Sequence, residues 1–326
     1  MKKYILLAAL LFCVSLAGCG NPAKKNTNLT VVTTIFPLYD WTASIIGEAG
    51  EGQKSPDLKV LLTNGTDIHS YQPSAADIVT ISTSDVFIYV GGESDGWVAD
   101  VLKNAVNKDM IVVNLLEVLG DAVKEEETPE GATDTEKEEP EGAENGEKEF
   151  DEHIWLSLKN AEKCCEAIAV ALKTADSANA SRYEENLSSY LAKVGALDKE
   201  YRRVAEEAPV KTLLFGDRFP FRYLTDDYGI SYFAAFSGCS AETEASFETV
   251  SFLAGKVNEL GLKSIMIIDS SDGRVAETIR RSTKTGDQSI LTLDSLQSVS
   301  DKDIRSGITY LSVMEKNLEV LKEALR

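Results

Sequence analysis

The chain has 326 residues, which is enough to bury a large core and to form two domains. Its formal net charge is −20, from 53 acidic and 33 basic residues, so it lacks the basic surface that nucleic-acid binding requires. Such an acidic chain suits a protein that handles cations or is well solvated outside the cytoplasm.

Residues 1–18 have the features of a bacterial lipoprotein signal peptide. Two lysines precede an apolar run that is too short to span a bilayer as an ordinary transmembrane anchor, and Leu16-Ala17-Gly18-Cys19 matches the lipobox. We therefore expect the mature chain to begin at Cys19, whose thiol receives the lipid on the extracytoplasmic face of the membrane. Residues 19–28 are polar and predict a flexible tether.

The first half of the mature chain alternates apolar strands with amphipathic helices. β-branched and apolar runs predict strands, and apolar residues at helical spacing predict helices. The predicted strands are residues 29–36, 58–62, 86–90 and 111–114, and the predicted helices are residues 38–47, 74–82 and 98–106. Alternation at this spacing indicates a parallel sheet with helices on both faces.

An acidic segment then interrupts the pattern. Residues 121–152 contain 15 acidic residues and three lysines, which contribute −12 to the net charge. A segment with so little apolar surface cannot bury enough of it to fold, so we expect a disordered insertion over residues 121–150. Its carboxylates could also collect cations at low affinity.

The second half predicts another strand–helix series after two helices at residues 158–172 and 181–208. Strands are predicted at residues 210–215, 231–235, 264–268 and 289–293, and helices at 221–228, 247–260, 275–282 and 308–325. The predicted fold class is α/β, with two parallel-sheet lobes (residues 29–180 and 209–326) joined by the helix at 181–208, roughly 40 Å long. Ligands of such sheets bind beyond the carboxyl ends of the strands, which places the expected site in the interlobe cleft.

The chain contains only two histidines, His69 and His153, each in an acidic loop sequence. They are either solvated loop residues or metal ligands, because imidazole is a common ligand for zinc. Asp217, Asp269 and Asp294 follow predicted strands and could add carboxylates. Two imidazoles with one or two carboxylates suit zinc or manganese. A closed site would hold metal and an open one could catalyse, but no HExxH helix, nucleophile elbow or P-loop is present.

The cysteines do not indicate a disulfide framework, because three remain after Cys13 is lost with the signal peptide and Cys19 is lipidated. Cys164 and Cys165 are adjacent on a predicted helix and are interpreted as small buried residues. Cys239 is either a small buried loop thiol, which is the commoner role, or a soft zinc ligand.

Several motifs occur in a characteristic order along the chain. After the lipobox come a first strand that ends at Phe36-Pro37, His69 in a short Asp-rich loop, D-x-H-x-W-L at residues 151–156 and Y-L-S-x-M-x-x-N-L at residues 310–318. Together they resemble the zinc/manganese solute-binding lipoproteins of ABC importers, over essentially the whole mature chain. The resemblance implies two lobes joined by one rigid helix, a metal in the cleft, a permease as partner and a monomeric protein.

The resemblance also implies a set of ligands. His69 and His153 match the two ligands of the first lobe. The family places His or Glu after the strand at residues 211–215, where Asp217 is the chemically sensible substitute. For the fourth ligand, the spacing from the closing helix favours Gln297 and the chemistry favours Asp294.

These features predict a metal-binding component of an importer rather than an enzyme. Zinc is the favoured metal, and manganese is the alternative because the acidic insertion lacks the histidines common in zinc-binding members. A surface adhesin with the same fold and a secreted metallohydrolase with Glu152 as general base are the alternatives from other functional classes.

Overall fold

The computed structural model describes residues 28–50, 54–63, 65, 67–132, 149–240 and 244–326. The predicted signal peptide, Cys19 and all but the last residue of the predicted tether lie outside the described residues. Within the described part of the chain, no helix is both long enough and apolar enough to cross a bilayer.

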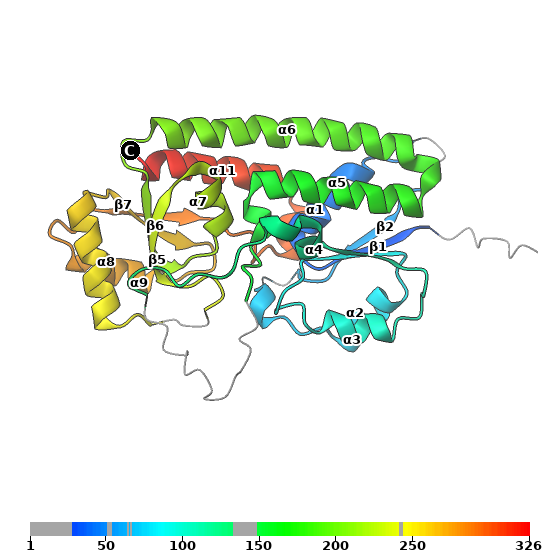
Figure 1. Ribbon diagram of the computed structural model, residues 1–326, viewed down its shortest axis with the longest axis horizontal. Coiled ribbons are helices and arrows are strands. Elements are labelled where there is room, and N and C mark those ends of the chain that lie inside the picture. The colour runs from blue at the N-terminus through cyan, green and yellow to red at the C-terminus, as the bar shows by residue number, and fades with distance from the viewer. Residues whose placement is uncertain (1–27, 51–53, 64, 66, 133–148, 241–243) are drawn as a thin grey trace, which may run out of the picture.

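The described residues form two four-stranded parallel sheets, one in each half of the chain (Figure 1). The strand order is β2-β1-β3-β4 in the first sheet and β6-β5-β7-β8 in the second. The strands are β1 (Thr30–Thr33), β2 (Asp57–Val60), β3 (Val86–Tyr89), β4 (Ile111–Asn114), β5 (Thr212–Arg218), β6 (Ser231–Phe236), β7 (Ser264–Ile268) and β8 (Ser289–Leu293). The predicted α/β fold with two parallel sheets is therefore confirmed.

Helices cover both sheets and connect their strands. They are α1 (Phe36–Ile46), α2 (Ala75–Ser82), α3 (Val98–Lys103), α4 (Leu115–Leu119), α5 (Leu158–Ala175), α6 (Ala180–Glu207), α7 (Arg222–Tyr228), α8 (Phe247–Leu260), α9 (Arg274–Ser282), α10 (Asp301–Arg305) and α11 (Tyr310–Ala324). Helix α1 begins two residues before the predicted start because Pro37 occupies its first turn, where the missing N–H costs nothing.

Helix α6 is the long helix that the sequence predicts, and it runs along both lobes with α11 beside it (Figure 1). Its 28 residues correspond to about 42 Å at 1.5 Å per residue. A single face is buried, through Tyr183, Leu187, Tyr190, Val194, Leu197, Tyr201 and Val204. The Tyr201 hydroxyl donates to the carbonyl of Met314 in α11 at 2.6 Å, which fixes the two helices to each other.

A series of hydrogen bonds links the two lobes. Trp155 lies in the short 3-10 helix η3 (Ile154–Leu156), and its indole N–H donates to the carbonyl of Ser295 at 2.9 Å. The Tyr310 hydroxyl donates to the carbonyl of Trp155 at 2.7 Å, and the Tyr310 N–H donates to Asp40 in α1 at 3.0 Å. Trp155 and Tyr310 belong to a hydrophobic core cluster that includes residues of both sheets, and Asp40 and Ser295 are also buried.

The ends of the acidic insertion are folded. Glu125 and Phe150 form an antiparallel bridge, and the N–H of Asp151 donates to the carbonyl of Lys124 at 2.9 Å. The Lys124 N–H donates to the hydroxyl of Tyr223 at 3.0 Å. The prediction of disorder over residues 121–150 is therefore wrong for its two ends, because residues 124–126 pair with residues 149–151 and Lys124 contacts the second lobe. The remaining residues, 133–148, lie outside the described part.

Candidate metal site between the lobes

His69 is held in a short 3-10 helix, η1 (Ile68–Ser70), that follows β2. The Asp67 side chain caps this helix and accepts a hydrogen bond from the His69 N–H at 3.1 Å. Ile68 is buried and anchors the turn in the core. The imidazole therefore projects from a fixed turn beyond the carboxyl end of a strand, as the sequence predicts.

His153 immediately precedes η3 and is completely buried. Asp151 accepts hydrogen bonds from both the His153 N–H and the His153 Nδ1–H, each at 2.9 Å. Because the carboxylate can only accept, the Nδ1 atom carries a proton and the ring orientation is set. The Trp155 ring packs beside the imidazole, with ring centroids 5.4 Å apart.

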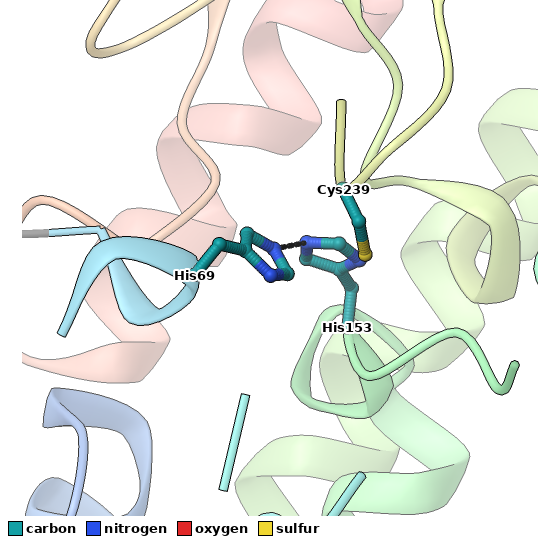
Figure 2. Close-up of side chains that lie close together, drawn as sticks. All are labelled: His69, His153 and Cys239. Atoms are coloured by element: carbon teal, nitrogen blue, oxygen red, sulfur yellow. Dashed lines mark hydrogen bonds between the residues drawn. The ribbon is translucent and has the colours of Figure 1, made fainter. Parts of the chain in front are cut away.

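The two imidazoles face each other through their Nε2 atoms, which are 3.1 Å apart (Figure 2). The Nδ1 atom of His69 lies 2.9 Å from the Ser94 hydroxyl, and 3.8 Å from a carboxylate oxygen of Glu152 that has no hydrogen-bond partner. Metal-binding histidines are typically fixed in this way, with the outer nitrogen bonded to protein and the inner one directed at the metal. The structure thus brings together the two histidines that the sequence singles out.

The protonation of the pair follows from its surroundings. Burial lowers the pKa of His69 to about 4, and the charge of His153 acts in the same direction. Burial also acts to lower the pKa of His153, but the carboxylate of Asp151, through its charge and hydrogen bond, outweighs it and raises the pKa. Of the two imidazoles, His153 therefore holds a proton more strongly than His69 does.

Cys239 comes from the second lobe and completes the cluster, as Figure 2 shows. One donor atom from each of His69, His153 and Cys239 lies within 4.8 Å of the others, and among the described residues this is the only such group of His, Cys, Asp or Glu. The Cys239 N–H donates to the Glu126 carboxylate at 3.0 Å. Burial, then the charges of Glu126 and neighbouring carboxylates, raise the pKa of the thiol.

Gln297 also reaches this cluster. In the amide orientation that satisfies its neighbours, its oxygen accepts from Nε2 of His153 at 3.2 Å, and its nitrogen donates to the Asp67 carboxylate oxygens at 2.8 and 3.3 Å. The preceding residue, Leu296, has φ of 61°, an unusual backbone conformation for a residue with a side chain. Spacing from the closing helix therefore identified a residue that does lie at the site.

The two aspartates that were favoured by chemistry lie elsewhere. Asp217, at the end of β5, accepts from the Arg218 N–H at 2.8 Å, and Asp294, just after β8, accepts from the Leu296 N–H at 2.8 Å. Neither belongs to the His–Cys cluster. Asp269 accepts from the N–H and hydroxyl of Ser295, both at 2.7 Å, and so fixes a loop.

Members of the His–Cys cluster and Asp217 line two different cavities. The larger has a volume of about 900 Å³ and is lined by His69, Cys239 and four glutamates: Glu93, Glu126, Glu149 and Glu152. The other, of about 440 Å³, is lined by Asp67, Asp217 and Arg218 but by none of the three clustered residues. Of these two cavities, the larger is therefore the one that reaches the His–Cys cluster, and its lining is acidic.

An ion pair crosses the cleft beside the site. Arg218 of the second lobe contacts Asp67 of the first at 2.8 Å. Arg218 is thus paired with the residue that caps the His69 turn, although its charge still acts to lower the pKa of His69. Burial acts to raise the pKa of Asp67, but Arg218 and His69 outweigh it and lower the pKa.

The residues that orient the candidate ligands were not predicted from the sequence. Asp67 and Asp151 each lie two positions before a histidine and accept from its N–H, so a repeated D-x-H pattern was the available signal. Ser94 and Glu126 carry no comparable signal, because they reach the site from distant parts of the chain.

The support from Asp151 can be tested by a conservative substitution. Asp151→Asn keeps the size of the side chain but removes the charge that makes the His153 ring a stronger ligand. Zinc affinity should fall by about tenfold, at the lower end of the range for such outer partners, as measured by competition with a chelating dye. Exposed Asp109, changed to Asn in the same way, should leave affinity unaltered.

The fold and the paired imidazoles define a two-lobed binding protein with a candidate metal site in its cleft. The chain belongs to the ZnuA family, described as zinc-uptake complex component A, periplasmic, whose sequence profile matches residues 31–324.

Relatives support the same assignment. The chain is 30% identical to the zinc-binding protein AdcA of Streptococcus pyogenes serotype M3, covering 99% of this chain but 61% of AdcA. It is also 30% identical to the high-affinity zinc uptake system protein ZnuA of Bacillus subtilis, covering 99% of this chain and 98% of that protein.

Solved structures show the same fold. The Zn(II)-bound ZnuA-like domain of Streptococcus pneumoniae AdcA is 27% identical, with a TM-score of 0.70 and coverage of 92% of this chain and 99% of that domain. The laminin-binding protein Lmb of Streptococcus agalactiae, described as having adhesin and metal-transporting activity, has a TM-score of 0.72 at 22% identity, over 92% of this chain and all of that one. At that identity the likeness extends to the fold alone.

Proposed function

We propose that this protein captures zinc outside the cytoplasmic membrane and delivers it to the permease of an ABC importer. The observation that carries the proposal is the pair of facing Nε2 atoms of His69 and His153, 3.1 Å apart, whose outer nitrogens are both fixed by protein. Two preorganised imidazoles beside a cavity lined by glutamates suit a borderline divalent cation. The zinc-binding and zinc-uptake relatives support the same metal.

The proposal extends to processing, quaternary state and further ligands. We propose lipidation at Cys19, removal of residues 1–18, and a monomeric protein whose lobes span residues 29–180 and 209–326. Gln297 is the candidate for a further, neutral ligand because its amide oxygen already contacts His153. Asp217 and Asp294 would have to give up their loop hydrogen bonds to reach the metal.

A binding role is better supported than hydrolysis. A metallohydrolase needs a general base on the metal side of its ligands. Glu152, the candidate base, lies on the Nδ1 side of His69, and its other oxygen accepts from the Ser94 N–H at 2.8 Å. An adhesin role is favoured by no feature of the described residues beyond the fold shared with Lmb.

Metal preference is the direct test of the proposed function. The purified full-length chain, equilibrated with equal concentrations of zinc and manganese, should retain about one zinc per chain and little manganese when analysed by elemental mass spectrometry. Nitrogen ligands bind zinc more tightly than manganese in the general order of divalent metals. Retention of manganese in preference to zinc would support the manganese alternative, and retention of neither would contradict the proposal.

Zinc affinity should depend on pH in a defined direction. The raised pKa of His153 means that a proton occupies the metal-facing side below that pKa, whereas above it the imidazole is neutral and available. Affinity should therefore decrease as pH falls through this pKa, above the ordinary His value of 6.5, by about tenfold per pH unit for each proton displaced. Titrations at several pH values would check this, and an affinity independent of pH would contradict it.

A further inference from the structure

We propose that the thiolate of Cys239 is the third metal ligand, so that the site has two nitrogen donors from the first lobe and one sulfur donor from the second. The inference rests on the proposed function, in which His69 and His153 hold the metal. It replaces the carboxylate that the sequence suggested for the second lobe. It also identifies the metals that the site should prefer.

The geometry of the three donors is close to that of a zinc centre. Zinc lies about 2.0–2.1 Å from imidazole nitrogen and about 2.3 Å from sulfur. In a tetrahedral site, these lengths put donor atoms roughly 3.3–3.6 Å from one another. The Nε2 atoms of the two imidazoles are 3.1 Å apart, and one donor atom of each of the three residues lies within 4.8 Å of the others, so the donors must close in by side-chain rotation to share one ion.

The loop that carries Cys239 is built to lie against His153. A Cβ atom on Gly238 would lie 3.1 Å from Cε1 of His153 and 3.0 Å from the carbonyl of Phe219, closer than side chains normally pack. Glycine therefore allows the backbone to approach the imidazole directly. On the other side, Glu126 of the first lobe accepts from the Cys239 N–H at 3.0 Å. These two features hold the backbone of Cys239 beside His153.

The end of β5 cannot supply a ligand in place of Cys239 without rearrangement. A Cβ atom on Gly216 would lie 2.4 Å from Cα of Ala276 in α9, so the packing of α9 leaves no room for any side chain there. Asp217, the next residue, lines the smaller cavity and not the one at the histidines. The loop after β6 is therefore the part of the second lobe that brings an ionisable donor to the cluster.

The thiol is also accessible to an incoming ion. Cys239 and His69 both line the larger cavity, whereas Cys164 and Cys165 are fully buried in α5. When the metal binds, the S–H bond breaks, sulfur donates its electron pair to the metal, and the proton leaves to water in the cavity. The metal supplies the positive charge that replaces this proton, so charge and atoms balance.

A thiolate ligand has a consequence for the metals that are captured. Soft sulfur donors favour zinc and other thiophilic ions, whereas manganese prefers oxygen donors. Cys239 thus becomes the residue that determines specificity, and Cys239→Asp should shift the preference of the site toward manganese.

Cobalt(II) substitution tests the ligand directly. The full-length chain loaded with Co²⁺ should show a sulfur-to-cobalt charge-transfer band in the near ultraviolet, in addition to the visible d–d bands of a tetrahedral site. The near-isosteric Cys239→Ser should lose the charge-transfer band, retain d–d bands and bind zinc about 100-fold more weakly, since loss of a ligand should cost at least as much as loss of an outer partner. Cys164→Ala, which removes a buried thiol, should retain the band.

Different results would contradict the thiolate ligand and the proposed function. Tetrahedral cobalt bands without the charge-transfer band in the wild-type chain, or unchanged zinc affinity in Cys239→Ser, would overturn the thiolate assignment alone. Stoichiometric zinc binding that survives loss of both histidines would overturn the proposed function itself. If Cys239→Ser does not fold, as judged by circular dichroism, the wild-type cobalt spectrum still decides the question.

Discussion

Alanine at both His69 and His153 should abolish high-affinity zinc binding. A four-ligand zinc site is worth about 10–16 kcal/mol, so each ligand contributes about 3 kcal/mol, or roughly a 100-fold change in affinity. Loss of both should therefore weaken binding by roughly 10⁴-fold, measured by competition with a chelating dye at constant pH. Each single variant should fall between the wild type and the double variant.

Two aspartates provide controls for this experiment. Asp217→Asn and Asp294→Asn remove the carboxylates that the sequence suggested as ligands, without removing a member of the His–Cys cluster. They should change zinc affinity only a little. A 100-fold loss in either variant would show that its loop rearranges to bind metal, and unchanged affinity in the double histidine variant would refute the site.

Trp155→Ala should both destabilise the protein and weaken zinc binding. The side chain is fully buried, so its loss should lower the free energy of unfolding by about 3–5 kcal/mol. It also removes the indole N–H that donates to Ser295 across the lobes, and the ring that packs against His153. Chemical denaturation of the metal-free protein would measure the first effect, and zinc titration the second.

Trp41→Ala is the matched control, because Trp41 is equally buried but lies in α1 and contacts the Tyr310 ring rather than a histidine. It should be destabilised by a similar amount, about 3–5 kcal/mol, with little change in zinc affinity for the folded protein. Equal losses of affinity in the two variants would indicate that Trp155 acts through stability alone. Trp155→Phe removes the indole N–H but keeps most of the packing of the ring. Comparison with Trp155→Ala should therefore separate the effect of the lost hydrogen bond to Ser295 from the effect of the lost ring.

Much of the architecture could be predicted from local patterns. Apolar β-branched runs and helical spacing identify the strands and the long helix α6, because burial of one face imposes a period on the sequence. The acidic ends of the insertion could not be predicted in this way. Their order comes from contacts with Tyr223 of the second lobe, which no local composition reveals.

The sequence by itself determined the two-lobed α/β fold and the histidine pair, since the alternation of strands and helices and the scarcity of histidine can be read along the chain. Only the tertiary structure decided which residues of the second lobe face that pair. The close packing of α9 leaves no room for a side chain at Gly216 in β5, and Gly238 allows the loop after β6 to bring Cys239 against His153. Such choices depend on distances between segments far apart in the chain, and therefore on packing that sequence spacing does not encode.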